Sequence, residues 1–262
     1  MYQIDILIQG YPGRAVCHGG LGWSTSTLLR SANHNILIDV GAFGVRHQLA
    51  RHLDACGVAP ADITDVVLTH AHYDHAVNFT LFPNATVWIG QQELEWAAAQ
   101  PPGFNPLPEL YVQELNRQAR VRRIGDGDTF LPGITAIASP GHTPGHLLFY
   151  VDDPRQAVLF SGDAAKNRAE LLSGQVADTA DAAASHASLQ RIWAWWRKRP
   201  GTLLVPGHDL GMTLDDTGAP VYVGERRAAI NAWFGEDLQP TRIDLCLSLI
   251  HISEPTRRRG IS

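Results

Sequence analysis

The chain has 262 residues, of which 45% are hydrophobic and 18% charged, and it carries a formal net charge of −5 at pH 7. This balance is typical of a globular protein with a sizeable core, and it excludes a disordered chain or a coiled coil. Three cysteines are too few for a disulfide framework or a cysteine-based zinc site. The unusual feature of the composition is its twelve histidines, several of which are clustered.

The N-terminal segment 1–8 does not have the pattern of a secretory signal peptide. Asp5 stands where such a peptide carries positive charge, and the apolar run is too short. Every apolar run in the chain is shorter than the ~18 residues that a membrane-spanning helix needs. We therefore expect a cytoplasmic protein without a membrane partner. Because the chain is acidic, we expect its partner to be a small-molecule substrate and not nucleic acid.

The last segment, 247–262, differs in origin from the rest of the chain. A common transposase sequencing adapter, translated in frame, reads Leu-Ser-Leu-Ile-His-Ile-Ser-Glu-Pro-Thr-Arg, which is the sequence of residues 247–257. The index and the adapter bases that follow account for the remaining residues. We therefore interpret 247–262 as an artefact tail and exclude it from fold reasoning. A single domain is expected over residues 1–246.

The periodicity of apolar residues predicts strands and helices that alternate along the chain. Strands are expected over residues 4–9, 25–30, 35–40, 65–69, 85–89, 129–138, 147–151, 157–161 and 202–205. Helices are expected over residues 45–56, 91–99, 110–119, 181–198 and 224–234. The proline-rich segment 101–108 is expected to be a loop and a lid over a site. Because strands and helices alternate through two similar halves, the predicted fold class is α/β.

A histidine-rich motif begins where the predicted buried strand 65–69 ends. Residues 69–75 read Thr-His-Ala-His-Tyr-Asp-His. Alternate side chains on leaving a strand point to the same side, which places His70 and His72 together. A turn into a helix would then bring Asp74 and His75 to a neighbouring position. Imidazole nitrogens and carboxylate oxygens at this spacing are ligands that suit zinc.

Three further short segments each follow a predicted strand and each offer one metal ligand. These ligands are His142, Asp163 and His208, and a glycine precedes each of them. Glycine and proline in these segments make the sharp turn that presents a side chain at the end of a sheet. In open α/β sheets ligands bind beyond the carboxyl ends of strands, where all of these segments are expected. Together the chain offers enough donors for two metal ions.

The order and spacing of these donors resemble those of the metallo-β-lactamase superfamily, and the likeness extends over residues 1–244. The resemblance implies a four-layer αβ/βα sandwich, in which two mixed sheets pack face to face with helices outside. It also implies the role of each ligand. The first metal ion would be bound by His70, His72 and His142, the second by Asp74, His75 and His208, and Asp163 would bridge the two.

Such a centre predicts a mechanism. Two divalent ions roughly 3.5–4 Å apart lower the pKa of a shared water towards neutrality. We therefore predict a dinuclear metal-dependent hydrolase that activates a bridging hydroxide to cleave an ester, lactone or thioester bond. Asp74 is the predicted catalytic residue, because it would carry the proton between the nucleophile and the leaving group. Both ions are expected to be zinc, with manganese or iron as alternatives.

Two segments indicate a branch of the superfamily. Residues 140–146, Pro-Gly-His-Thr-Pro-Gly-His, and the Ser-Gly-Asp that ends at Asp163 look most like acyl-homoserine lactonases and hydroxyacylglutathione hydrolases. The best-known lactonases carry a tyrosine three residues after the bridging aspartate, where this chain has Lys166. A lysine here could bind a substrate carboxylate or phosphate, and a solvated surface charge is the alternative. His146 and Asp39 are expected to orient metal ligands from behind.

Other interpretations stay open at this point. Parts of the N-terminal half also resemble the branch of metallo-β-lactamase domain-containing protein 1, which is associated with RNA cleavage. A phosphodiesterase or ribonuclease-like hydrolase is therefore the first alternative function. A mono-iron persulfide dioxygenase and a non-catalytic protein stabilised by metal are further alternatives. A structural zinc site is closed by four protein ligands, whereas seven ligands shared by two ions leave room for water, which favours catalysis.

Overall fold

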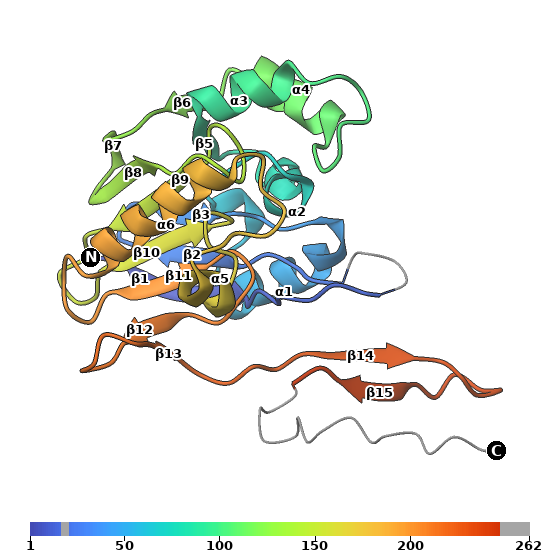
Figure 1. Ribbon diagram of the computed structural model, residues 1–262. Coiled ribbons are helices and arrows are strands. Elements are labelled where there is room, and N and C mark those ends of the chain that lie inside the picture. The colour runs from blue at the N-terminus through green and yellow to red at the C-terminus, as the bar shows by residue number, and fades with distance from the viewer. Residues whose placement is uncertain (17–20, 247–262) are drawn as a thin grey trace. The chain divides into compact units, whose positions relative to one another are not determined.

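The computed structural model describes residues 1–16 and 21–246 (Figure 1). The chain divides into two compact units, Met1–Val223 and the residues from Gly224 onwards, and each is described by itself. This division does not test the predicted domain over 1–246. The predicted artefact tail, 247–262, lies outside the described residues. Among the described helices, none is long and apolar enough to cross a lipid bilayer.

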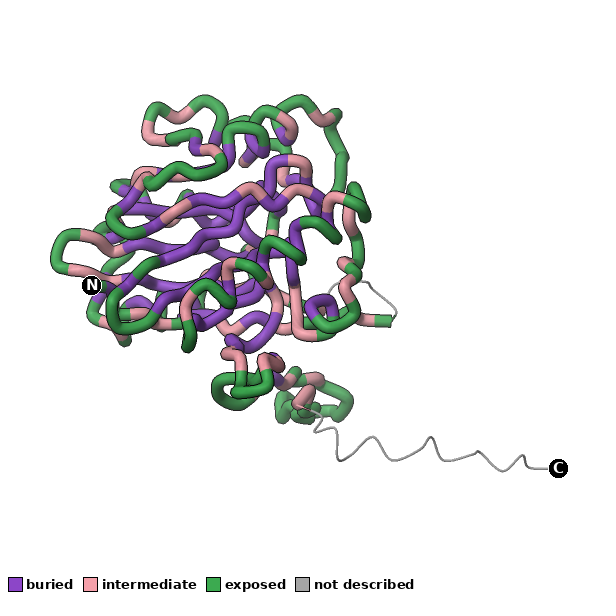
Figure 2. The backbone as a smooth tube through the Cα atoms, turned by 60° about the vertical axis from the view of Figure 1, so that its left-hand side comes forward, coloured by how far each residue is buried: buried purple, intermediate pink, exposed green. Residues whose placement is uncertain are grey.

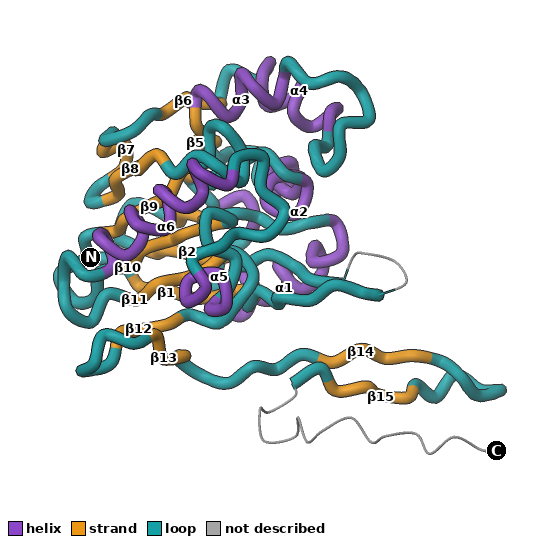
Figure 3. The backbone as a smooth tube through the Cα atoms, in the orientation of Figure 1, coloured by secondary structure: helices purple, strands orange, loops and turns teal. Residues whose placement is uncertain are grey.

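The first unit contains two mixed sheets (Figure 3). Six strands form the first sheet in the order in which they occur along the chain. They are β1 (Gln3–Ile8), β2 (Ser26–Arg30), β3 (Asn35–Ile38), β4 (Asp65–Val67), β5 (Thr86–Gly90) and β6 (Val121–Ile124). The pairs β1–β2 and β2–β3 are antiparallel, and β3, β4, β5 and β6 run parallel. The carboxyl ends of β3 to β6 therefore meet at one edge.

The second sheet has seven strands in the order β13-β12-β11-β10-β9-β8-β7. They are β7 (Thr129–Leu131), β8 (Ile134–Ala138), β9 (Leu147–Val151), β10 (Val158–Gly162), β11 (Leu203–Pro206), β12 (Met212–Leu214) and β13 (Pro220–Tyr222). β10 and β11 pair in parallel, and the other pairs are antiparallel. The parallel pair brings the ends of β10 and β11 together, which positions the residues that follow them.

Helices cover the outer face of each sheet. Those of the first unit are α1 (Arg46–Ala55), α2 (Tyr73–Ala76), α3 (Gln91–Ala98), α4 (Glu109–Arg117), α5 (Arg168–Ser173) and α6 (Ala182–Trp196). Short 3₁₀ turns occur at η1 (Phe43–Val45), η2 (Pro60–Asp62) and η3 (Val77–Leu81). Apolar residues of α1, α3 and α4 pack on the first sheet, and those of α5 and α6 pack on the second.

Strand alternation explains how the layers pack. Ile36 and Ile38 of β3 point into a core shared with the second sheet, whereas Leu37 points to the helices outside. Phe149 of β9 enters the same shared core, and Tyr150 faces the layer of α6. Because successive side chains point to opposite faces, a strand buried on both sides reads as a continuous apolar run. Figure 2 shows these strands as the buried centre of the unit. The predicted α/β class and four-layer αβ/βα sandwich are confirmed.

One prediction is wrong in the second unit. Residues 224–234 were predicted to be helical, but β14 (Ala229–Ala232) pairs antiparallel with β15 (Thr241–Asp244). Every side chain of β14 is exposed or half-buried. A helix there would have no buried apolar face, and packing of such a face supplies most of the stability of short helices. In the first unit, the apolar pattern did not predict β6, α5, β12 or β13.

Candidate metal centre

Four loops bring the predicted ligands together, and each loop follows a strand as expected. The loop after β4 carries the motif 70–75, and the loop after β8 carries His142. Asp163 follows β10 directly, and His208 lies two residues beyond β11. Within the motif the backbone of His72 is extended and α2 starts at Tyr73, so the chain changes direction between the two pairs of ligands.

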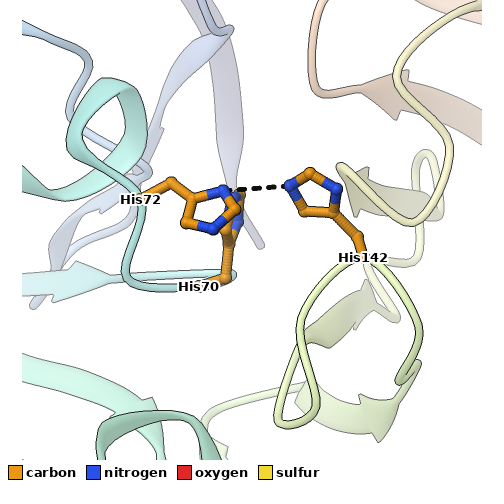
Figure 4. A group of neighbouring side chains, drawn as sticks. All are labelled: His70, His72 and His142. Atoms are coloured by element: carbon orange, nitrogen blue, oxygen red, sulfur yellow. Dashed lines mark hydrogen bonds between the residues drawn. The ribbon is translucent and has the colours of Figure 1, made fainter. Parts of the chain in front are cut away.

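The first group of donors consists of His70, His72 and His142, whose candidate ligand atoms all lie within 4.8 Å of one another. The Nε2 atom of His142 is 3.0 Å from Nδ1 of His72, and Figure 4 shows these two nitrogens directed at each other, with His70 beside His72. All three side chains are buried. Burial holds the pKa of His70 and His72 well below the ordinary value and lowers that of His142 to about 4. These imidazoles are therefore neutral, which is the form that binds metal.

The second group consists of Asp74, His75 and His208, and its donor atoms meet the same distance limit. Asp74 Oδ2 is 3.4 Å from His208 Nε2 and 3.7 Å from His75 Nε2. The two histidine nitrogens are 3.4 Å apart. Asp74 is the most exposed of the three side chains, at 18%, so this group borders the open side of the site.

The carboxylate of Asp163 lies between the two groups. Its Oδ1 is 3.2 Å from Nε2 of both His75 and His208, and its Oδ2 is 3.3 Å from Nε2 of His142. Burial would raise the pKa of Asp163, but the neighbouring histidines, His208 foremost, outweigh burial and hold that pKa well below its usual range. An ionised carboxylate with one oxygen towards each group is the geometry that a ligand shared by two cations requires.

Two buried atoms in this cluster fit a bound cation. Within the described residues, His70 Nε2 has no hydrogen-bond partner, and Asp163 Oδ1 has only the imidazole nitrogens of His75 and His208 at 3.2 Å. Neither atom is accessible to solvent. A buried polar atom left without a partner costs about 1–3 kcal/mol. A metal ion would satisfy both atoms, and the set of imidazole nitrogens and carboxylate oxygens is one that zinc accepts. The residues present therefore fit a metal centre.

Asp39 holds two of the histidines from behind. Its Oδ2 lies 2.8 Å from Nδ1 of His75 and also accepts the hydroxyl proton of Thr69 at 2.8 Å. Thr69 Oγ1 is in turn 3.0 Å from Nδ1 of His70. Because the threonine hydroxyl donates its proton to the hydrogen bond with Asp39, its oxygen accepts a hydrogen bond from the Nδ1–H of His70. Both histidines are thereby left with Nε2 directed at the centre, which is how outer partners fix the tautomer of a ligand.

His146 lies behind Asp163 and belongs to neither group of donors. Its Nε2 accepts the backbone N–H of Asp163 at 3.0 Å, and its Nδ1 is 2.7 Å from the hydroxyl of Ser139. The side chain is fully buried, and burial keeps its pKa well below the ordinary value. A neutral ring in this position fixes the backbone from which Asp163 extends.

Lys166 is close to the centre, but its ammonium is already engaged. Nζ donates to the carbonyl of Ala177 at 2.6 Å and lies 3.1 Å from Oε1 of Glu170. Its side chain is only 15% exposed, so the alternative of a solvated surface charge does not describe it. The charge of Lys166 is near enough to contribute to the lowered pKa of His142.

Glu93 is a site residue that the sequence did not reveal. This carboxylate in the first turn of α3 is fully buried and accepts hydrogen bonds from both ligand-bearing loops at 70–72 and 142–146. Burial raises its pKa to about 7. The helix begins with the polar sequence Gln-Gln-Glu, which is typical of a solvated surface and gives no sign that the glutamate is buried. The predicted loop 101–108 also reaches the motif, because the Pro106 carbonyl accepts the backbone N–H of Tyr73.

The fold and this cluster together define an αβ/βα sandwich with a histidine and aspartate centre at the ends of its strands. A model of the metallo-beta-lactamase superfamily matches residues 19–208. The chain belongs to that superfamily.

Similar proteins include lactonases. N-acyl homoserine lactonase AttM of Azorhizobium caulinodans is 33% identical over an alignment of 176 residues, which covers 59% of this chain and 61% of that protein. Metallo-beta-lactamase domain-containing protein 1 of Homo sapiens is 33% identical over 125 residues, or 47% of this chain and 40% of the human protein. The chain thus spans about three fifths or less of the length of these curated relatives.

Solved structures share the fold. AidC, a dizinc quorum-quenching lactonase in complex with a product, superimposes with a TM-score of 0.65 at 18% identity, over 78% of this chain and 80% of AidC. A mutant of AiiA from B. thuringiensis, with N-decanoyl-L-homoserine bound at the active site, gives a TM-score of 0.64 at 18% identity, over 79% and 92% of the two chains. At this identity the likeness establishes the architecture of the chain.

Proposed function

We propose that this chain is a metal-dependent hydrolase that holds two zinc ions and cleaves an ester, lactone or thioester bond of a small molecule. The observation that carries the proposal is the position of Asp163, whose two carboxylate oxygens face different groups of histidines. A structural zinc site is closed by four protein ligands of its own, whereas here three donors belong to each ion alone and the seventh, Asp163, is shared between them. Three protein ligands and an open position are typical of catalytic zinc, which favours a centre that is open to water and substrate.

Each ion has its own ligands in this proposal. His70, His72 and His142 would hold the first, Asp74, His75 and His208 would hold the second, and Asp163 would be shared by both. When bound, two divalent ions lower the pKa of a shared water and polarise a substrate carbonyl. Zinc suits the mixed nitrogen and oxygen donors, and manganese or iron are the alternatives.

Asp74 is the proposed catalytic residue. Its carboxylate is three times as exposed as that of Asp163, 18% against 6%, so it borders the side from which water and substrate enter. The 3.4 Å between Asp74 Oδ2 and His208 Nε2 keeps the carboxylate against the centre. From this position Asp74 Oδ2 accepts the proton of the attacking water and delivers it to the departing oxygen or sulfur.

A small carbonyl compound is the substrate class that we propose, and lactones are its first members. AttM is a lactonase, and the AiiA mutant holds N-decanoyl-L-homoserine. Lys166 is the proposed contact for a substrate carboxylate or carbonyl oxygen. In the free protein its ammonium donates to the carbonyl of Ala177, so binding in this way requires the substrate oxygen to replace that carbonyl.

A substrate panel tests the proposal. The full chain is stripped of metal with a chelator, reloaded with zinc, and assayed on an acyl-homoserine lactone, S-lactoylglutathione, an aryl ester and bis-nitrophenyl phosphate. Asp163→Asn serves as the matched variant, because it keeps the shape of the side chain but removes its charge. We expect zinc-dependent turnover of one of the carbonyl substrates, strongly reduced in the variant.

Each other outcome overturns part of the proposal. Turnover of the phosphodiester alone contradicts the carbonyl substrate class and favours the phosphodiesterase alternative. Silence across the panel in a folded, zinc-loaded sample contradicts hydrolysis, and oxygen uptake by the iron-loaded protein would then identify the dioxygenase. Equal turnover with and without zinc contradicts a metal-dependent reaction.

A further inference from the structure

One buried carboxylate connects the two loops that supply the first group of histidines. Glu93 lies in the first turn of α3, and its side chain has no exposed surface. α3 follows β5 and the loop with His70 and His72 follows β4, both strands of the first sheet, whereas His142 comes from the loop after β8 of the second sheet. The carboxylate therefore lies where loops of the two sheets meet.

Three hydrogen bonds converge on Glu93. Oε1 accepts the backbone N–H of Ala71 at 2.9 Å. Oε2 accepts the hydroxyl of Thr143 at 2.6 Å and the backbone N–H of Gly145 at 3.2 Å. Ala71 stands between His70 and His72, and Thr143 follows His142 directly. Oε1 is thus bonded to the loop that carries His70 and His72, and Oε2 is bonded to the loop that carries His142.

The loops have little freedom to find other positions around this carboxylate. A Cβ atom added to Gly145 would lie 2.0 Å from the backbone nitrogen of Glu93, so the loop backbone passes directly against α3. A Cβ on Gly90, the residue before α3, would likewise lie 2.8 Å from the carbonyl oxygen of Gly145. Because the backbones pack closely here, the hydrogen bonds of Glu93 fix the distance between the two loops.

No ion pair explains why an acidic residue occupies this place. Among the ion pairs of the described residues, none includes Glu93, and its partners are two backbone amides and one hydroxyl. A buried carboxylate without a cation is costly, and a hydrophobic residue of similar volume would avoid that cost. A carboxylate is required only if the two loops must be bonded to one rigid group.

We propose that Glu93 is a positioning residue for the His70–His72–His142 group, which sets the distance between the loop that carries His70 and His72 and the loop that carries His142. The inference rests on the proposed function only in that this group binds a metal ion. Removing the link lowers the affinity of the first zinc site. The three hydrogen bonds described for Glu93 all go to the loops of the first group, so the second site, formed by Asp74, His75 and His208, keeps its affinity.

Zinc affinity of four variants of the full chain tests this inference. Glu93→Gln keeps the size of the side chain but replaces one acceptor oxygen by an amide donor. Glu95→Gln is the matched control, because Glu95 has the same charge on the same helix but is 54% exposed. Thr143→Val removes one hydrogen bond to Glu93, and Thr143→Ser restores the hydroxyl.

Two zinc-binding steps are measured by competition with a chromophoric chelator. We expect Glu93→Gln to weaken one step by about 10–100-fold, the usual effect of losing a partner behind a metal ligand, and to leave the other step unchanged. Thr143→Val should weaken the same step by about 10-fold, since it loses one bond to a charged group. Thr143→Ser and Glu95→Gln should match the unmodified protein.

The test separates positioning from stability and from the reaction. Circular dichroism of the metal-free variants reports whether they fold, and if Glu93→Gln does not, the Thr143→Val and Thr143→Ser pair decides the question. Unchanged affinities in Glu93→Gln or in Thr143→Val overturn the inference, as does equal weakening of both zinc steps. Two zinc ions bound without any turnover contradict the proposed reaction alone, because the affinities still report the role of Glu93.

Discussion

The carboxylate of Asp39 lies 2.8 Å from Nδ1 of His75 and leaves Nε2 of that ring facing Asp163. Asp39 has a backbone φ of 51°, in the left-handed region that few residues other than glycine adopt. It is kept there by its bonds to the backbone N–H and the hydroxyl of Thr69. Residues in such conformations are common at functional sites, where contacts with surrounding residues hold the backbone in place.

Removal of this carboxylate should loosen the second metal site. We expect Asp39→Ala to lower the affinity for one zinc ion by about 10–100-fold, because His75 loses the partner that fixes its tautomer and ring orientation. Chelator competition measures the affinity. Asp54→Ala, at an exposed position of α1, is the control and should bind zinc normally. Unchanged zinc affinity in Asp39→Ala would show that the contact with His75 has no role in ligand orientation.

Loss of the Asp163 charge should affect both ions. We expect Asp163→Asn to reduce the zinc content from two ions to about one and to lower turnover by more than the ~10–100-fold typical of an outer partner. The reason is that its two oxygens face different histidine groups. Elemental analysis after dialysis gives the stoichiometry, and Asp126→Asn, at an exposed aspartate paired with Arg191, is the control. Two tightly bound ions in Asp163→Asn would rule out a shared carboxylate.

Asp74 should act on the rate more than on substrate binding. Asp74→Asn should lower kcat by about 10²–10⁴-fold and change KM little, because an amide cannot take up the proton of the attacking water. Measurements at saturating zinc separate this effect from weaker metal binding. An unchanged kcat in Asp74→Asn would assign the proton transfer to another group.

The metal-free protein should lose stability in acid. Burial lowers the pKa of His70, His72, His142 and His146 in the folded protein, so on acidification below about pH 6.5 the unfolded chain binds protons that the folded chain does not. The raised pKa of Glu93 acts in the opposite sense between pH 4.5 and about 7, but the four histidines outweigh it, so the free energy of unfolding falls as the pH drops. His142, with a pKa of about 4, accounts for about 3 kcal/mol of this loss.

The carboxylates beside His75 and His208 raise the pKa of these two histidines against the effect of burial. The two histidines therefore add to the free energy of unfolding below pH 6.5, and this stabilisation is lost as the pH rises above that value. The greatest stability of the metal-free protein is thus expected near pH 6.5. Urea unfolding at pH 4.5, 5.5, 6.5 and 7.5 checks this, with the exposed His47→Gln as a control of unchanged profile. Equal free energies at pH 4.5 and 6.5 would contradict the account.

The candidate ligands could be predicted from the sequence because each lies within a few residues of the end of an apolar strand. Strands such as β4 and β10 are buried on both faces, so their sequences are continuous apolar runs with clear ends. His70 follows β4 of the first sheet and Asp163 follows β10 of the second, and the packing of the two sheets brings these side chains together although 93 residues separate them along the chain. In this fold, the position of a residue relative to a strand end determines its place in the site.

Other features leave no local signal in the sequence. Glu93 is bonded to residues 22 and 50 positions away, and those partners are identified only once the two sheets are assembled. β6 carries the exposed Arg122 and Arg123 and lacks the apolar run that marks a buried strand. The error at 224–234 has a related cause, because apolar residues at helical spacing predict a helix only where another element packs against them.

A zinc titration tests the central claim most directly. The metal-free full chain is titrated with zinc while turnover of the preferred carbonyl substrate from the panel is followed. The account predicts that turnover rises to a plateau at two equivalents, and that Asp163→Asn reaches no comparable plateau. Full turnover at one equivalent, or turnover that does not depend on zinc, would contradict a reaction carried out by two ions at this centre.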